Sequence, residues 1–148
     1  MPLKLLYNHC IKQLAHSLEV LEIRKAEIAL ALESESKSSA GDKHETGRAM
    51  IQLEREKLGE QIKKAEKNRA TLHQLKQYKS SGIVRFGSAV QTNKANYYIA
   101  IATDSCTIKS TLFHCISPQS PVGTQLLGKK VGDQLVFNAI TSTITAVH

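Results

Sequence analysis

The chain has 148 residues, a formal net charge of +7, 41% hydrophobic and 22% charged residues, and no Trp. This composition is typical of one or two small globular domains. Apolar runs such as residues 28–32 are far shorter than the roughly 20 residues of a membrane span, and the three widely spaced Cys residues form no C-x-x-C pair. These features argue against a membrane protein, a disulfide framework and a zinc module, and favour a reducing, cytoplasmic location.

Charged residues are concentrated in the first half of the chain. Residues 1–80 hold 15 Lys/Arg and 11 Asp/Glu, whereas residues 81–148 hold 5 and 2. Both halves are basic, so the density of charge separates them and its sign does not. The change in density predicts two different domains, residues 1–79 and residues 80–148.

The first domain is predicted to be a helical hairpin. Its apolar side chains form two narrow stripes with spacings typical of heptads, and neither helix is able to bury its stripe alone. An intermolecular coiled coil or a larger bundle fits the same stripes, but a polar break at residues 34–47 between two similar arms favours an antiparallel hairpin with a solvated tip. The stripes are Tyr7, Ile11, Leu14, Leu18, Leu21, Ile28 and Leu32, with Lys25 as one polar interruption, followed by Ile51, Leu58, Ile62, Ala65, Leu72 and Leu75.

The second domain is predicted to be a small β-sheet with one short helix, which makes the fold class α+β. Turn residues and short apolar runs predict strands at residues 83–90, 97–102, 135–137 and 141–147, and a further strand within residues 106–116. Residues 120–128 predict the helix, with Ser120 as N-cap, Pro121 at the first helical position and Gly128 as the stop.

Two stretches of this domain resemble the Gre transcript-cleavage factors of bacterial RNA polymerase. Residues 120–133, SPVGTQLLGKKVGD, are similar to the family signature S-P-[IVL]-[AG]-x-x-L-[IL]-G-K-x-x-G-D. Residues 84–90, VRFGSAV, are similar to the V-x-F-G-[SA]-x-V strand that opens the FKBP-like C-terminal domain of the family. In the first domain, residues 41–45 (GDKHE) stand where the family carries G-D-x-x-E at its coiled-coil tip.

The resemblance implies an accessory factor and not an enzyme in its own right. Gre factors dock at the secondary channel of RNA polymerase, insert their coiled coil, and help the polymerase to cleave backtracked RNA near its 3′ end. By this resemblance, Asp42 and Glu45 are catalytic in trans and hold a Mg²⁺ shared with the polymerase, with none expected in the free protein. The resemblance also carries the expectations of a monomer, of DNA binding, of cytoplasmic action and of no membrane partner.

Further residues complete the expected site. Ser120, Pro121 and Leu127 are the expected polymerase-docking surface, because they belong to the family signature. The basic residues Lys37, Lys43 and Arg48 flank the tip acids, and we expect them to lie near RNA phosphates. Solvated charges at helix ends are an equally good interpretation of these three residues.

Other interpretations stay open at this stage. Asp42 followed by Glu45 also fits a capping box at the start of the second helix. After Glu45 the chain reads Thr-Gly-Arg-Ala where Gre tips typically read Asn-Ala-Glu-Tyr, so a Gre-like modulator that does not stimulate cleavage is the nearest alternative. A coiled-coil adaptor is a further alternative, and a prolyl isomerase ranks low because the chain has few aromatic residues. His44 with the two acids as a transition-metal site ranks low as well.

The three cysteines are predicted to be packing residues. Cys10 lies near the first stripe, where it is expected to be a small core residue. Cys106 and Cys115 fall in the strand-rich domain without a spacing typical of metal ligands, so strand packing is the expected role of both thiols.

Overall fold

The structure is a computed structural model that describes residues 2–37 and 42–148, with side chains described for residues 2–35 and 45–148. The chain divides into two compact units, one formed by Met1–Gln13 together with Ala70–His148 and the other by Leu14–Arg69. The expected boundary at residues 79/80 stays a prediction. The contacts nevertheless group residues 1–13 and 70–79, the two ends of the expected first domain, with the expected second domain. None of the helices described is long and apolar enough to cross a membrane.

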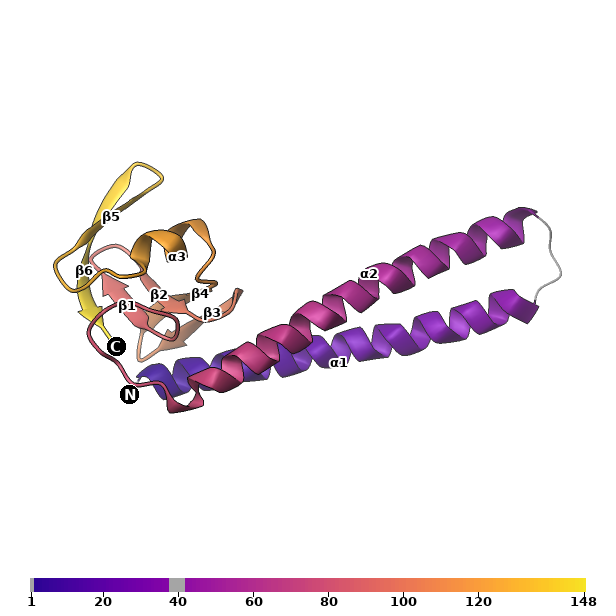
Figure 1. The fold of residues 1–148 in the computed structure, drawn as a ribbon, viewed down its shortest axis with the longest axis horizontal. Helices are drawn as coiled ribbons and strands as arrows, with labels where there is room; N and C mark the ends of the chain where they lie inside the picture. Colours follow the sequence, from indigo (N-terminus) through magenta and orange to yellow (C-terminus); the bar gives the residue numbers. More distant parts are fainter. Residues whose placement is uncertain (1, 38–41) are drawn as a thin grey trace. The chain divides into compact units, whose positions relative to one another are not determined.

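The unit Leu14–Arg69 consists of two helical segments that run side by side in opposite directions (Figure 1). They belong to α1 (Pro2–Lys37) and α2 (Asp42–His73). The predicted stripes face each other: Leu14, Leu18 and Ile28 of α1 and Leu58 and Ala65 of α2 are at most 9% exposed. The predicted helical hairpin is therefore confirmed.

An ion-pair network links the outer surfaces of the two helices. The Arg24 guanidinium on α1 pairs with the Glu54 carboxylate on α2 and with Glu27 in its own helix. All three side chains are about half exposed, so solvent screens these pairs strongly. The apolar seam and not the charged surface therefore supplies most of the stability of the hairpin.

Both helices extend further into the polar segment than the sequence indicates. Helix α1 ends at Lys37 and α2 begins at Asp42, so most of the expected tip at residues 34–47 is helical, and residues 38–41 lie outside the described chain. Gly47 lies inside α2, where a Cβ would meet only the Glu35 carboxylate, at 3.7 Å. Ser, Glu and Lys are tolerated in helices, so polarity alone does not mark a loop.

The other unit contains a mixed sheet, six-stranded in the part of the chain that the structure describes, with the order β3-β4-β2-β1-β6-β5. Its neighbouring strands are antiparallel except for β2 and β4, which run parallel. The strands are β1 (Ala89–Thr92), β2 (Asn96–Ile99), β3 (Thr103–Ile108), β4 (Thr111–Ile116), β5 (Gln134–Phe137) and β6 (Ile140–Val147). The predicted α+β fold class is confirmed.

The strand expected at residues 83–90 is largely wrong. Only its last two residues belong to β1, and Ile83 forms an isolated bridge to Lys130. Between them the chain turns: the Ser88 N–H donates to the Arg85 carbonyl, and the Ser88 hydroxyl accepts from the Arg85 N–H. The apolar residues within 83–90 favoured a strand, and for this reason the turn was not predicted.

The segment expected to hold one strand, residues 106–116, contributes to two. Strands β3 and β4 form an antiparallel hairpin joined at Lys109 and Ser110, which both have positive φ angles, of 47° and 69°. Such turns are normally marked by Asn or Gly. Because this turn carries neither residue, the start of a separate strand β3 was not predicted.

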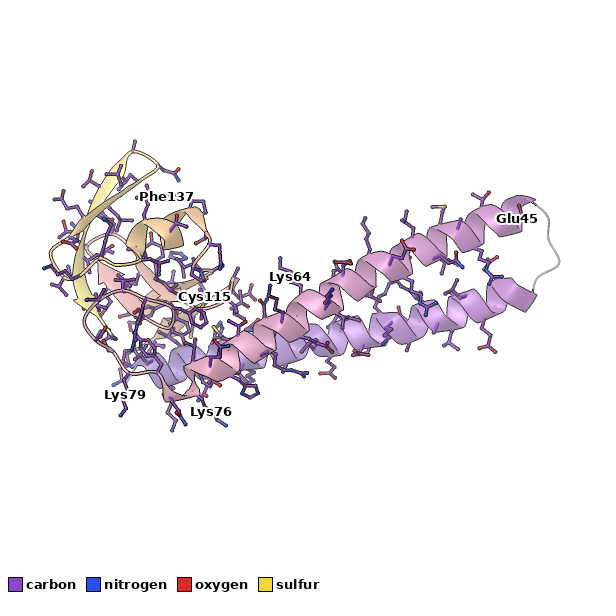
Figure 2. The ribbon with its side chains drawn as sticks, in the orientation of Figure 1. Glu45, Lys64, Lys76, Lys79, Cys115 and Phe137 are labelled. Atoms are coloured by element: carbon purple, nitrogen blue, oxygen red, sulfur yellow. The ribbon has the colours of Figure 1, made fainter. Side chains whose placement is uncertain are left out.

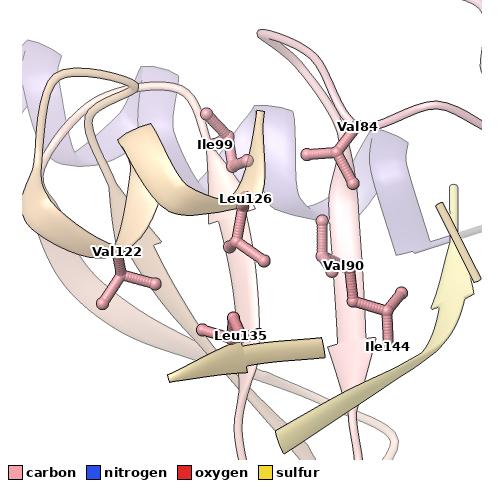
Figure 3. Packing of buried hydrophobic residues seen from close by; sticks show 7 residues of the cluster. All are labelled: Val84, Val90, Ile99, Val122, Leu126, Leu135 and Ile144. Carbon is pink, nitrogen blue, oxygen red and sulfur yellow. The ribbon is translucent and has the colours of Figure 1, made fainter. Parts of the chain in front are cut away.

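Apolar side chains cover both faces of the sheet. Helix α3 (Pro121–Leu126) lies on one face, over a cluster that Figure 3 shows in close-up. On the opposite face, Leu6 and Cys10 of α1 and Leu72 of α2 have no exposed surface, and Tyr98 of β2 is 2% exposed. The α3 cluster consists of Val84, Val90, Ile99, Val122, Leu126, Leu135 and Ile144.

The turn before β1 packs tightly against the segment that follows α2. The Tyr78 hydroxyl hydrogen-bonds the Ser88 hydroxyl at 2.7 Å, and the Arg85 guanidinium carbon lies 4.9 Å from the centre of the Tyr78 ring. A Cβ on Gly87 would lie 2.6 Å from Cδ2 of Tyr78 and 2.7 Å from Cδ2 of Leu75. Since Tyr78 is held at both its ring and its hydroxyl, it has little room to move.

Replacing Gly87 with Ala therefore tests this packing. We expect Gly87→Ala to lower the free energy of unfolding by about 2–3 kcal/mol, because it adds a steric clash to backbone strain at a φ of +97°. Gly82→Ala is the matched control, since Gly82 has a φ of +82° but open space around its Cβ position, and it should cost only about 1 kcal/mol. Urea denaturation measures both values, and equal costs would contradict the close packing.

Candidate functional site

The two expected metal-binding positions lie at the start of α2. The helix begins at Asp42, and Glu45 follows in its first turn with an exposed side chain. Figure 2 labels Glu45 at the beginning of α2. Residues three apart in a helix lie on the same face, so the backbone places both positions on one side of the first turn. The side chain of Asp42 lies outside the described ones, and the metal role of the pair stays a prediction.

The first turn of a helix is an electrostatically favourable place for carboxylates. Its free N–H groups and the helix dipole both stabilise negative charge there. This environment suits the capping-box interpretation of Asp42 and Glu45 as well as the metal-binding one. The side chain of Glu45 is exposed, as the metal-binding interpretation requires.

The three basic residues expected near RNA lie at the end of α1 and at the beginning of α2. Lys37 is the last residue of α1, Lys43 lies in the first turn of α2, and Arg48 lies one turn further along with an exposed side chain. The side chains of Lys37, Lys43 and His44 are outside the described set. Among the side chains that are described, no group of three or more His, Cys, Asp or Glu residues gathers to hold a metal ion.

Ser120 caps α3, as predicted. Its hydroxyl accepts a hydrogen bond from the Gly123 N–H at 3.1 Å and donates one to the Ser117 carbonyl at 2.6 Å. A Cβ on Gly123 would lie 2.4 Å from that same carbonyl oxygen. Ser120 is therefore committed to holding α3 in place, and its hydroxyl has little left to offer a docking partner.

The other two predicted docking residues face solvent. Pro121 opens α3 with an exposed ring, and Leu127, immediately after α3, is 40% exposed. The rest of the signature shapes the turn beyond α3: Gly128 adopts a φ of +84°, and the Asp133 carboxylate accepts from the Lys130 N–H at 2.9 Å. The signature thus serves the local fold as well as the surface.

Exposed apolar side chains near α3 were not predicted from the sequence. They are Val131 in the loop after α3, the cross-strand pair Phe137 and Ile140 on one face of the β5–β6 hairpin, and Val136 on its other face. Strand β5 contacts α3 and is the last strand in the sheet, so nothing in the chain described covers its outer side. The run Leu-Val-Phe at residues 135–137 was a signal, because an exposed strand face is usually polar.

Comparison with known families identifies the sheet-containing part of the chain. Residues 79–147 match the model for the C-terminal domain of the GreA/GreB transcription elongation factors. This range contains all the strands, α3 and both stretches that carry the resemblance, and the resemblance is thereby confirmed. The hairpin lies outside the matched range. A search among curated proteins found no match.

The cap of α3 provides a test of how the signature acts. We expect Ser120→Ala to lower the free energy of unfolding by about 1–2 kcal/mol, because Gly123 loses its acceptor and Ser117 its donor. Thr124→Ala is the control, since its exposed hydroxyl donates only to the Pro121 carbonyl within the helix, and it should change stability by less than about 0.5 kcal/mol. Thermal unfolding compares the two, and similar losses would contradict the capping role.

Proposed function

We propose that this chain, whose residues 79–147 match the GreA/GreB C-terminal domain, is a transcription elongation factor of the Gre type that inserts its hairpin into the secondary channel of RNA polymerase and stimulates cleavage of backtracked RNA. The observation that carries the proposal is the combination of a GreA/GreB C-terminal domain with a helical hairpin that has Asp42 and Glu45 at the start of α2. The factor acts in the cytoplasm as a monomer. The polymerase remains the enzyme.

The form of the hairpin suits a narrow channel. The α1 segment from Leu14 to Lys37 rises about 36 Å, and each helix with its side chains is about 10–12 Å across. Its outer surface is mixed, because charged side chains such as the Arg24–Glu54 pair lie among exposed apolar ones that include Leu30 and Met50. The dimensions of the hairpin support insertion.

The donor set at the tip fits Mg²⁺. This ion prefers hard oxygen ligands and is commonly held by only one or two carboxylates. Bound between factor and polymerase, Mg²⁺ supplies electrostatic stabilisation for cleavage of the phosphodiester. In the proposal, Asp42 and Glu45 hold it from the factor side, while Lys37, Lys43 and Arg48 offer positive charge to the phosphates of the backtracked RNA.

A second function is favoured by one observation in the sequence of α2. After Glu45 no further acid follows before Glu54, and Arg48 stands in the turn between them. A tip with fewer acids binds a cation less strongly and an RNA phosphate more strongly. This composition supports the alternative of a secondary-channel modulator that binds the polymerase without stimulating cleavage.

Docking of the C-terminal domain is the remaining part of the proposal. Pro121, Leu127 and the β5–β6 hairpin expose apolar side chains around α3, and apolar side chains at the centre of an interface carry much of its binding energy. Ser120 contributes indirectly, by capping the helix that presents Pro121. We assign RNA polymerase as the partner of this surface.

The tip acids are tested by RNA cleavage in stalled, backtracked polymerase complexes. We expect the wild-type factor to accelerate cleavage and the double variant Asp42→Asn/Glu45→Gln to lose at least about tenfold of that acceleration while still binding, since even groups that only orient a metal ligand have effects of this size. Glu60→Gln is the control, because Glu60 is exposed on α2 away from its first turn. Full stimulation by the double variant would contradict the metal role, and binding of the wild type without acceleration would favour the modulator.

The docking surface is tested by affinity for RNA polymerase. We expect Leu127→Ser to raise the dissociation constant by about tenfold, or about 1.4 kcal/mol, because a half-exposed apolar anchor is lost. Leu112→Ser is the matched control, since Leu112 is 46% exposed on β4 and lies outside the proposed surface. A labelled factor titrated with polymerase gives both constants, and equal weakening by the two variants would count against docking through α3.

A further inference from the structure

The fold brings together three cysteines that are far apart in the sequence. Cys10 lies on α1 and Cys115 on β4, both buried, whereas Cys106 on β3 is partly exposed. All three belong to the unit that contains the sheet, and Cys115 is labelled in Figure 2. The proposed function uses none of them.

The register of the sheet directs Cys115 towards α1. Cys115 lies opposite Thr103 of β3 and beside Tyr98 of the parallel strand β2. The neighbour of Tyr98 along β2, Ile99, belongs to the cluster beneath α3, so Tyr98 and Cys115 point to the other face. That face is the one covered by the first turns of α1, where Cys10 is fully buried.

A hydrogen bond fixes α1 at this place. The His9 ring Nε2–H donates to the backbone carbonyl of Asp104, with 2.8 Å between nitrogen and oxygen. Asp104 follows Thr103, the residue paired with Cys115, so α1 is held beside β3 and β4 one residue before Cys10. In this arrangement Cys10 and Cys115 are close enough for each thiol to shift the pKa of the other.

The two neighbouring thiols differ in acidity. The contact with Cys115 and burial both raise the pKa of Cys10, which therefore keeps its proton. The contact with Cys10 lowers the pKa of Cys115, against the opposing effect of burial. Two neighbouring thiols of different acidity are an arrangement from which an attacking cysteine, here Cys115, and a resolving cysteine, here Cys10, can operate.

We propose that Cys10 and Cys115 are a redox modification site, at which hydrogen peroxide forms a reversible disulfide between α1 and β4. This site is independent of the polymerase interaction proposed above. The bond closes a loop of about 105 residues, and closing so long a loop restricts the unfolded chain strongly. The oxidised protein therefore melts at a higher temperature, by about 5–15 °C.

The chemistry balances with peroxide as the oxidant. The Cys115 thiolate attacks one peroxide oxygen, the O–O bond breaks, and the departing hydroxide takes up a proton to become water, leaving a sulfenic acid on Cys115. The Cys10 sulfur then loses its proton and attacks Sγ of Cys115, and the S–O bond breaks with release of a second water. Two thiols are oxidised to one disulfide and one peroxide is reduced to two waters, and a dithiol reductant reverses the bond by exchange.

Peptide mapping of the wild-type protein tests the proposal without any substitution. Trypsin places the three cysteines in different peptides, residues 5–12, 95–109 and 110–129, so each possible pairing has its own mass. After stoichiometric hydrogen peroxide, alkylation and digestion without reductant, we expect a linked 5–12/110–129 peptide and a fall from three free thiols to one. Dithiothreitol should restore all three.

Two controls separate the fold from random oxidation. The Cys106→Ser variant should form the same linkage with the same yield, because Cys106 takes no part in the bond. Oxidation of the chain unfolded in concentrated urea should give a mixture of all three pairings. A native product dominated by a Cys106 linkage, a native mixture equal to the urea mixture, or three free thiols after peroxide treatment would each overturn the proposal.

Discussion

The fold depends on the burial of one face of the sheet beneath the first turns of α1. Leu6 and Cys10 have no exposed surface, and each apolar side chain buried in this way contributes about 1.5–3 kcal/mol. Tyr98 and Phe113 on that face would otherwise meet water. Because the cover comes from the beginning of the chain and the sheet from its end, Met1–Gln13 and Ala70–His148 form a single compact unit, and the intervening hairpin begins and ends at this unit.

The sequence revealed local structure better than it revealed this long-range packing. Heptad spacing predicted the hairpin, because its stripes are buried between neighbouring helices, and the Ser120 cap predicted α3, because capping is local. Leu6 was missed because the extrapolated stripe pointed to Tyr7, whereas the sheet and not the partner helix covers the start of α1. The hairpin of β3 and β4 was missed because its turn residues, Lys109 and Ser110, have positive φ angles that are normally found at Asn or Gly.

Some parts of the candidate site could be predicted from the sequence and others could not. The signature at residues 120–133 identified the C-terminal domain. The structure explains two of its residues, because Ser120 caps α3 and Asp133 closes the turn that follows it. The exposure of Val136 and Phe137, on opposite faces of β5, could be known only from the fold, in which β5 is the last strand of the sheet. Proximity of the Cys10 and Cys115 thiols likewise arises from packing between distant segments.

In the proposed complex with RNA polymerase, the location of Glu45 is the most direct measure of whether the hairpin reaches the active centre. A photoreactive amino acid placed at position 45 is irradiated in a backtracked complex whose RNA is labelled near its 3′ end. Insertion predicts a covalent adduct with the RNA from position 45, whereas the same group at position 127 should label polymerase and no RNA. Labelling of polymerase from position 127 without any RNA adduct from position 45 would contradict insertion of the tip.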